Sequence, residues 1–189
     1  MDKNKVRFGL SNVAVGSFTE SSGIVTLGAP QKIPGAVNLT MDPETAESIF
    51  YADNVKYFVR NQDNGYSGEL EMAKFPDSFK TAFMNYVALT GGGIAEIKTK
   101  ANTPVYIIFQ VEGDVQARRT ILYNVSLGAI TEEHSTTEEE IEPNTETLPI
   151  NVVGDNVTGM VKASYEPQDT PYDSLYTTPP VPALPGESS

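Results

Sequence analysis

The sequence contains no cysteine and no tryptophan among its 189 residues. Without cysteine the chain has no disulfide, no thiolate nucleophile and no zinc site with cysteine ligands. Without tryptophan it lacks the largest flat aromatic side chain, which would serve best as a platform for a sugar ring. The sequence also has no run of 18 apolar residues, and no apolar stretch follows the charged N-terminus. We therefore expect neither a membrane span nor a secretory signal.

Positive charge is scarce and unevenly placed. The chain has 13 Lys and Arg against 25 Asp and Glu, for a formal net charge of −12. Lys162 is the only cation after Arg119, and residues 131–146 contain seven Glu and no Lys or Arg. Tight binding to DNA or RNA depends on basic side chains that neutralise phosphates, so the charge argues against DNA or RNA as a tight partner. A surface past which DNA slides without sticking stays compatible with the composition.

Candidate catalytic groups are few. The single histidine, His134, lies in an acidic segment, where a histidine–carboxylate cluster could bind a metal or act as a base. The simpler interpretation is a solvated loop histidine beside acids. Glu69 and Glu71 lie two residues apart on a predicted strand, a spacing typical of a solvated sheet face rather than of a glycosidase pair. We expect no catalytic, cofactor or metal site, and hence no enzyme.

Most of the chain has the alternation and β-branched content of strands. Strands are predicted at residues 6–15, 24–27, 33–40, 55–60, 66–74, 105–111, 120–125, 145–153 and 157–164. Segment 105–111 is almost continuously apolar, which indicates a strand buried on both faces. Asn64-Gly65 predicts a tight hairpin turn, because such turns need positive φ at both central residues. Pro149 predicts an edge or bulged position for its strand.

One helix is expected at about residues 76–89. Pro76, Asp77 and Ser78 form a start signal, and Phe79 and Phe83 recur at helical spacing. Three consecutive glycines at 91–93 are placed to end this helix. A single apolar stripe indicates that the helix lies on a sheet.

Segment 41–54 is predicted to be a loop, because it lacks a clear period and carries Pro43 and several acids. It also contains Phe50 and Tyr51. Large apolar side chains in a loop need cover, either from the chain's own core or from a neighbouring molecule. We identify Phe50 and Tyr51 as candidates for contact between subunits.

The composition changes near residue 165. Six of the 13 prolines fall between residues 167 and 185, interspersed with Tyr172, Leu175 and Tyr176. This pattern is typical of an extended arm rather than of a core element. The three apolar side chains are further candidates for contact between subunits. The expected organisation is a β domain at residues 1–164 and a C-terminal arm at 165–189.

These elements predict a mainly β (α+β) fold, a β-sandwich or barrel with one flanking helix. A series of segments in order then resembles the major tail proteins, or tail tube proteins, of long-tailed, non-contractile bacteriophages. The segments that carry this resemblance are residues 5–13, 33–39, 41–44, 50–54, 64–71, 75–79, 119–124 and 142–148. Residues 172–176 resemble the closing segment of that family, but the Trp or Phe expected near Leu175 is missing and the proline-rich end, residues 177–189, departs from it.

The resemblance implies a structural subunit of the virion that stacks with copies of itself, usually as hexameric rings, into a hollow tube for DNA ejection. The implied partners are other copies of the chain and the tail terminator, distal tail and tape-measure proteins. DNA would pass through the lumen without specific binding. We expect Glu69 and Glu71 to line that lumen.

Two other interpretations stay open at this stage. One is the inner tube of a contractile particle, such as a bacteriocin or secretion system, which differs by a surrounding sheath. The other is a monomeric β-sandwich that binds carbohydrate or protein. The missing tryptophan and the lack of a secretory signal weigh against this second alternative.

Overall fold

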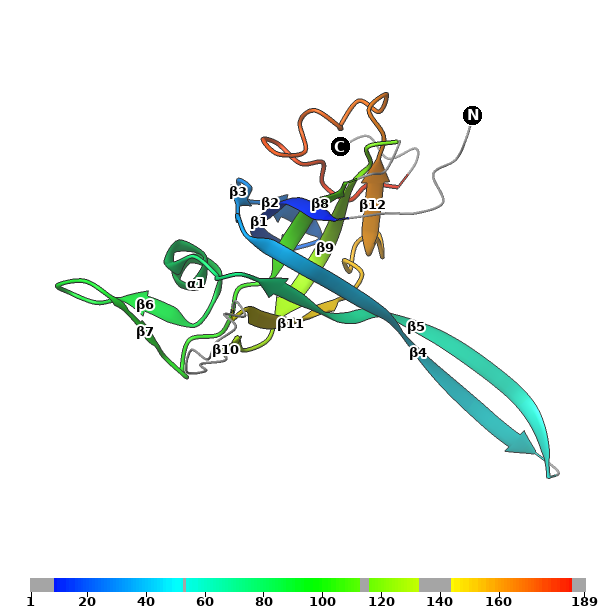
Figure 1. Cartoon of the computed structure of the whole chain (residues 1–189). Coiled ribbons are helices and arrows are strands. Elements are labelled where there is room, and N and C mark those ends of the chain that lie inside the picture. The colour runs from blue at the N-terminus through cyan, green and yellow to red at the C-terminus, as the bar shows by residue number, and fades with distance from the viewer. Residues whose placement is uncertain (1–8, 53, 113–115, 133–143, 185–189) are drawn as a thin grey trace, which may run out of the picture.

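The computed structural model describes residues 9–52, 54–112, 116–132 and 144–184, and this part of the chain is mainly antiparallel β-sheet with one helix (Figure 1). The predicted fold class is confirmed. The strands are β1 (Leu10–Ser21), β2 (Ile24–Leu27), β3 (Gln31–Lys32), β4 (Ala36–Ala52), β5 (Val55–Met72), β6 (Tyr86–Ala88), β7 (Ile94–Glu96), β8 (Val105–Val111), β9 (Arg119–Leu127), β10 (Thr131–Glu132), β11 (Glu146–Val152) and β12 (Lys162–Tyr165). The helix is α1 (Asp77–Phe83).

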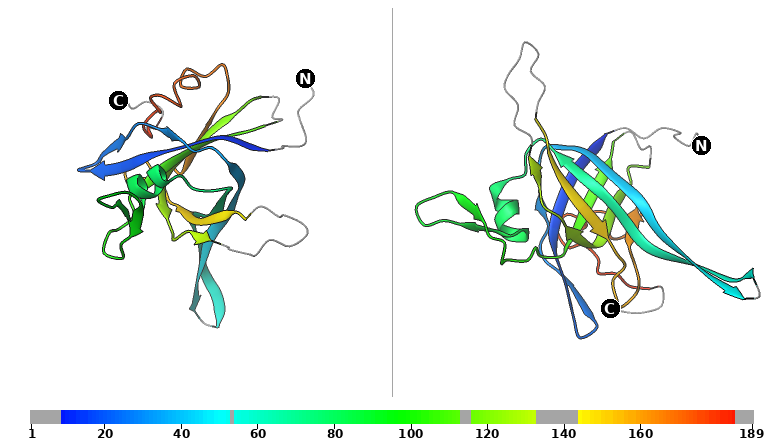
Figure 2. Two further views of the ribbon diagram at one scale, coloured as in Figure 1. Left: turned by 60° about the vertical axis from the view of Figure 1, so that its left-hand side comes forward. Right: turned by 90° about the horizontal axis from the view of Figure 1, so that it is seen from below.

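One strongly curved sheet forms the body of the molecule. Its strand order is β2-β1-β8-β9-β11-β5-β4, with β3 paired to β1, β10 to β11 and β12 to β9. β11 pairs with the C-terminal end of β9 and β12 with its N-terminal end, so the sheet divides at β9. The two views in Figure 2 show how the sheet wraps around its interior while β4 and β5 project from it. A separate two-stranded sheet, β6–β7, follows α1.

The central strands are buried on both faces, as predicted for β8. Ile107 and Leu122 point into the main core, whereas Ile108 and Ile121 point to a second cluster on the other side of the same strands. All four side chains are fully or almost fully buried. The alternation of a strand sends successive side chains to opposite faces, so continuous apolar sequence requires cover on both.

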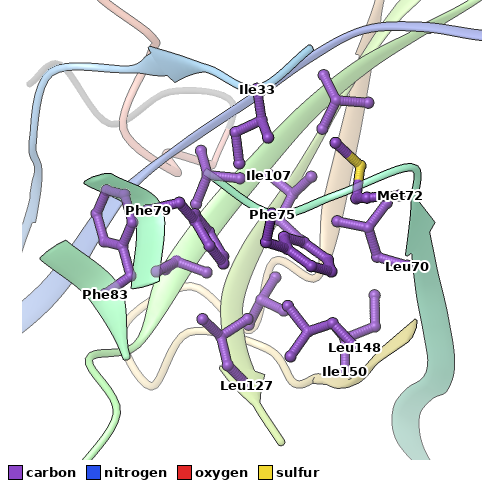
Figure 3. Close-up of a cluster of buried hydrophobic side chains, with 14 of the residues drawn as sticks. Ile33, Leu70, Met72, Phe75, Phe79, Phe83, Ile107, Leu127, Leu148 and Ile150 are labelled. Carbon is purple, nitrogen blue, oxygen red and sulfur yellow. The ribbon is translucent and has the colours of Figure 1, made fainter. Parts of the chain in front are cut away.

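Helix α1 is shorter than predicted. It begins at Asp77, as expected, but ends at Phe83, and residues 86–88 form β6 instead of a further turn. The predicted stripe is confirmed at Phe79 and Phe83, which pack with Phe75 against the sheet (Figure 3). Lys100 donates from Nζ to the carbonyl of Thr81 at 3.1 Å, satisfying a carbonyl of the last turn. Glycines 91–93 all have positive φ and connect β6 to β7 rather than capping the helix.

Pro149 lies in neither an edge strand nor a bulge, so this prediction is wrong. β11 pairs in regular register with β5 along its whole length. On its other side β11 pairs with β10 up to Thr147 and with β9 from Ile150 onward. The proline therefore lies where the partner strand changes, and its missing N–H costs no ladder hydrogen bond.

A buried lysine ties the helix to the sheet. The side chain of Lys80 is 6% exposed, and its Nζ lies 3.1 Å from Glu132 and 3.3 Å from Glu146. Burial lowers the pKa of Lys80, but the two carboxylates outweigh this and raise it. Glu146 also accepts a hydrogen bond from the backbone N–H of Phe75 at 2.7 Å. These contacts hold together the two chain ends that flank residues 133–143.

The connection from β11 to β12 is built around Asp155, which is 2% exposed. Its carboxylate accepts hydrogen bonds from the backbone N–H groups of Val157, Thr158 and Met160 at 3.0, 2.7 and 2.9 Å. The predicted strand at 157–164 is therefore reduced to β12, because its first residues close a loop on this carboxylate. Burial alone would raise the pKa of Asp155, but these hydrogen bonds lower it below its ordinary value.

We predict that Asp155→Asn destabilises the fold by about 1.5–3 kcal/mol at neutral pH, because hydrogen bonds to a charged acceptor are lost. The folded-state pKa is depressed, so the stabilisation is complete above the unfolded-state pKa of about 3.9 and is lost as the pH falls through the lower folded-state value. Urea denaturation of both proteins at pH 7 and pH 2.5 measures this, with the exposed Asp173→Asn as control. If the wild-type and Asp155→Asn proteins differed in free energy of unfolding by the same amount at both pH values, the stabilisation would not come from the charged carboxylate.

Candidate assembly surfaces

Segment 41–54 is a strand and not the predicted loop. It belongs to β4, which with β5 forms a continuous hairpin whose register runs from Ala36 opposite Met72 to Ala52 opposite Val55. The chain reverses between Ala52 and Val55, with Asn54 at φ 62°. Figures 1 and 2 show the far end of this hairpin extending well away from the body.

Asn64-Gly65 does not form a hairpin turn, because β5 runs straight through it. Asn64 and Gly65 together oppose Glu44, which makes a β-bulge in β5. The positive φ of Gly65, +96°, is used in this bulge. A Cβ at this position would lie 2.0 Å from the carbonyl oxygen of Val152, so only glycine allows β5 and the end of β11 to approach this closely.

The end of the hairpin exposes large apolar side chains. Val55, Tyr57 and Phe58 are 59%, 74% and 58% exposed, and no described part of the same chain covers them. Phe50 and Tyr51, the predicted contact residues, lie in β4 opposite this part of β5, with Phe50 in register with Phe58. The side chains of Phe50 and Tyr51 lie outside the described part of the structure, so their role in contacts between subunits stays a prediction.

The sheet has one extended polar face next to the hairpin. Glu69 is exposed and Glu71 half-buried on β5, whereas Leu70 and Met72 between and beyond them are buried on the opposite face. Glu71 accepts a hydrogen bond from the hydroxyl of Thr145 at 2.6 Å. The registers place the following residues on the same face: Asn38, Thr40, Asp42, Ser67, Ser126, Thr147, Pro149 and Asn151. None of these positions is Lys or Arg, and Asp42 is the only acid among them, so that with Glu69 and Glu71 the face carries three negative charges.

The predicted C-terminal arm folds back on its own subunit. Tyr172 is 8% and Leu175 0% exposed. Leu175 belongs to the second hydrophobic cluster, and the partly buried Tyr176 packs against it. The hydroxyl of Tyr123 donates to the carbonyl of Pro180 at 3.0 Å. Tyr172, Leu175 and Tyr176 were assigned to contacts between subunits because their segment was expected to pack little against its own chain. That reason is wrong. The expected boundary at residues 164 and 165 also falls inside β12.

Arg119 fixes this C-terminal segment. Its guanidinium carbon lies 3.9 Å from the ring centroid of Tyr172 and 5.1 Å from that of Tyr176, and its Nη1 donates to the carbonyl of Tyr172 at 2.6 Å. Tyr172 in turn donates its hydroxyl to the carbonyl of Ala117 at 2.7 Å. Burial raises the pKa of Tyr176 to about 12. A cation over a desolvated aromatic ring contributes about 2 kcal/mol of stabilisation. These contacts therefore stabilise the C-terminal segment on the rest of the subunit.

A seam separates the two ends of the curved sheet. β4 lies against the beginning of β1 without a ladder between them, since the only described partner of β4 is β5. The seam holds a hollow of about 390 Å³, and its lining includes Leu10, Val37, Leu39, Met41, Phe109 and Val111. Partly buried side chains that pack against the main core line this hollow, and they lie beside the edge of β4 that has no described partner strand. The sequence pattern did not reveal this feature.

His134 and most of the acidic segment around it lie outside the described residues. Within residues 9–52, 54–112, 116–132 and 144–184, no three His, Asp or Glu side chains are grouped so as to hold a metal ion. No helix in this part of the chain has the length and apolar character needed to cross a membrane.

No protein-family model and no curated protein matches the chain. Among solved structures, it is similar to the tube-terminating cap of the anti-feeding prophage, with 11% identity and a TM-score of 0.46 over 87% of this chain and 96% of that chain. It is also similar to a chain of the sheath–tube complex of an extracellular contractile injection system, PVC, in the extended state, with 9% identity and a TM-score of 0.45 over 86% and 93%. A chain of the anti-feeding prophage baseplate gives 11% identity and a TM-score of 0.46 over 89% and 99%.

Proposed function

We propose that the chain is a structural, non-enzymatic subunit that assembles with copies of itself into a hollow tube of a phage tail or a tail-like particle. The observation that carries this proposal is the projecting β4–β5 hairpin, whose end exposes Val55, Tyr57 and Phe58. A two-stranded hairpin is only marginally stable by itself in water, and an exposed apolar patch at its end is typical of a site that binds another protein surface. Burial of these side chains against a second copy would provide a favourable free energy of about 1.5–3 kcal/mol for each.

The curved sheet supports the same proposal. A sheet that ends in an unpaired strand tends to pair with another chain, and a closed ring of subunits would pair each such edge with the next copy. The interface is heterologous, because the hairpin of one copy contacts a different surface of the next. Repetition of such a contact produces rings or stacks rather than an isolated dimer.

The polar face is our candidate for the lumen wall. It carries Asp42, Glu69 and Glu71, and a ring of six copies would carry six times the chain's charge of −12. Duplex DNA is itself densely negative, so it would be repelled by such a wall and would pass without adhering. Terminator, distal tail and tape-measure proteins would be the further partners of such a tube.

We predict that Glu69→Lys combined with Glu71→Lys slows DNA release from assembled particles at least about tenfold at low salt, because each cation gained contacts phosphate. The slowing should weaken as salt is raised. Glu69→Gln with Glu71→Gln is the matched control, since it removes charge without adding cations. Release at the unchanged rate from intact particles of the lysine variant would show that this face does not line the lumen.

The kind of particle is a separate question. The sequence resembles tail tube proteins of non-contractile phages, whereas the similar solved structures described above come from contractile injection particles. The inner tube is common to both, and a surrounding sheath distinguishes them. Co-purification of tubes from the producing cells with a second, sheath-forming protein would assign the chain to the contractile kind.

Sedimentation velocity tests self-assembly of the intact chain. We expect species much larger than the 20.5 kDa monomer, whose proportion rises with protein concentration. A single 20.5 kDa species at every concentration, also after addition of preformed particle ends as seeds, would contradict the proposal and favour a monomeric binding module.

A further inference from the structure

Three neighbouring hollows follow the seam between β1 and β4. The hollow of about 390 Å³ at this seam shares Leu10 with a second hollow of about 420 Å³. On its other side it shares Met41, Phe109 and Val111 with a third hollow of about 220 Å³. Because the hollows share lining residues, they form one continuous groove, which we call the seam groove.

The middle of the seam groove is apolar. Val37 lines it and is 49% exposed, and Leu39, Met41 and Phe109 are only partly buried there. Single apolar side chains are common on protein surfaces, but several gathered in one hollow are typical of a site that receives another apolar surface.

One end of the seam groove is cationic, because Arg118 and Lys162 line the third hollow. Arg118 is paired with Glu166 at 3.0 Å. The ammonium of Lys162 instead donates to the hydroxyl of Tyr66 at 3.0 Å, and no residue in the described part of the chain gives it a carboxylate partner. An acidic group on the occupant of the groove would complement this charge.

The β4–β5 hairpin of the same chain cannot fill the seam groove. Its apolar end lies beyond Ala52, and the part of β4 from Met41 to Ala52 is about 36 Å long. Figure 1 shows this end of the hairpin far from the body of its own subunit. The occupant of the groove therefore comes from another molecule.

The end of the hairpin matches the groove in polarity and in spacing. Phe58, one of its three exposed apolar residues, lies opposite Phe50, and the exposed Glu47 lies three residues from Phe50, or about 10 Å. In the groove, Val37 lies four residues, or about 13 Å, from Met41, which borders the cationic hollow. The hairpin thus presents an apolar group and an acid at about the separation of the apolar middle and the cationic end.

We propose that the apolar end of the β4–β5 hairpin docks in the seam groove of a second copy of the chain. Phe58 and its apolar neighbours then cover Val37, and Glu47 lies beside Lys162. The contact joins two different surfaces, so it repeats from copy to copy along a ring or stack. This inference rests on the proposed function and deepens it, because it names the surface that receives the hairpin.

The absence of cysteine from the chain allows a clean crosslinking test. Val55→Cys in an affinity-tagged chain and Val37→Cys in an untagged chain are conservative changes at exposed positions, one in the hairpin end and one in the groove. The control mixture pairs Val55→Cys with Ile24→Cys, because Ile24 is 67% exposed but lies in β2, at the far end of β1 from the seam. Both mixtures of full-length chains are treated with a short thiol crosslinker.

We expect the test mixture to form dimers of the two different chains at least about tenfold faster than the control mixture, because docking raises the effective concentration of the two thiols. Equal rates in the two mixtures, or crosslinks mainly between two Val55→Cys chains, would overturn the proposal.

A charge exchange tests the contact between Glu47 and Lys162. Glu47→Lys and Lys162→Glu should each raise the concentration needed for assembly by about fivefold, since each places like charges together. Both changes in one chain should restore assembly, because every contact then carries the reversed pair. Lys98→Glu, at an exposed cation outside the groove, is the control and should have little effect. A double variant as impaired as the two single variants combined would refute this pairing.

The docking and the proposed function fail separately. Preferential crosslinking in a chain that never forms hollow tubes would support the docking and refute the tube. Tubes without preferential crosslinking would support the tube and refute the docking.

Discussion

A chain in which residues 47–61 are replaced by Asn-Gly is expected to fold as a monomer and to lose self-assembly. The replacement connects Ala46 to Gln62, which are partners across the hairpin, so the register of the remaining ladder is kept. The exposed residues Val55, Tyr57 and Phe58 are removed, while Gly65 and the core residues beyond it are untouched. Loss of this apolar surface should raise the concentration needed for assembly by more than about 100-fold, which corresponds to about 2.8 kcal/mol.

Point variants separate the apolar end from the hairpin as a whole. Tyr57→Ser with Phe58→Ser should reproduce most of the loss. Ile24→Ser with Val157→Ser, at residues 67% and 49% exposed elsewhere on the molecule, is the matched control and should assemble normally. Circular dichroism confirms the fold, and light scattering against concentration measures assembly. Normal assembly of the shortened chain would show that the end of the hairpin is not needed for self-assembly.

Removal of residues 166–189 is expected to unfold or aggregate the chain rather than to yield a folded monomer deficient in assembly. The removed segment includes Tyr172 and Leu175, and its loss uncovers Ile108, Ile121 and Tyr123 on the outer face of β8 and β9. Each buried side chain of this size contributes about 1.5–3 kcal/mol, and domains of this size are stable by only about 5–15 kcal/mol in total.

A graded series tests this without relying on a chain that fails to fold. Leu175→Ala should cost about 2–5 kcal/mol in urea denaturation, because it leaves a cavity in the second cluster. Leu184→Ala, at a residue 46% exposed, should cost less than about 0.5 kcal/mol. A truncated chain with the unfolding midpoint of the full chain would show that the segment is an independent arm after all.

Local pattern predicted the fold class and most of the core strands. The continuous apolar run of residues 105–111 correctly indicated a strand buried on both faces, and the alternation around Leu70 and Met72 correctly set Glu69 and Glu71 on the opposite face. These predictions succeeded because burial acts on each strand directly, whatever its partner.

Two predictions based on local turn and helix signals were wrong, namely the hairpin turn at Asn64-Gly65 and the end of the helix near residue 89. Gly65 has the positive φ that Asn-Gly signals, but in a bulge that brings β5 close to Val152. The available evidence for a long hairpin was the absence of Gly and Pro from residues 44–64, in which Asp53 and Asn54 are of residue types common in turns. The helix ends early because Met84 already has extended backbone angles, and Lys100, 19 residues from Thr81, donates to one of the carbonyls left free at that end.

The C-terminal segment shows the limit of composition as evidence. Its prolines correctly predicted a segment without helix or strand, but residues 167–178 form successive turns rather than an extended course. Leu175 packs in the second cluster, and Tyr172 is buried beneath the guanidinium of Arg119. Arg119 could have been noticed as one of the last cations before an acidic stretch, but its partners are more than 50 residues away. No local pattern encodes such a contact.

Negative-stain electron microscopy of the purified full-length chain over a range of concentrations tests self-assembly into a hollow tube most directly. The account predicts rings and stain-filled tubes of uniform width that become longer and more frequent as concentration rises, and that disappear in the variant with the shortened hairpin. Dispersed single particles of monomer size at every concentration, with or without seeds, would contradict it.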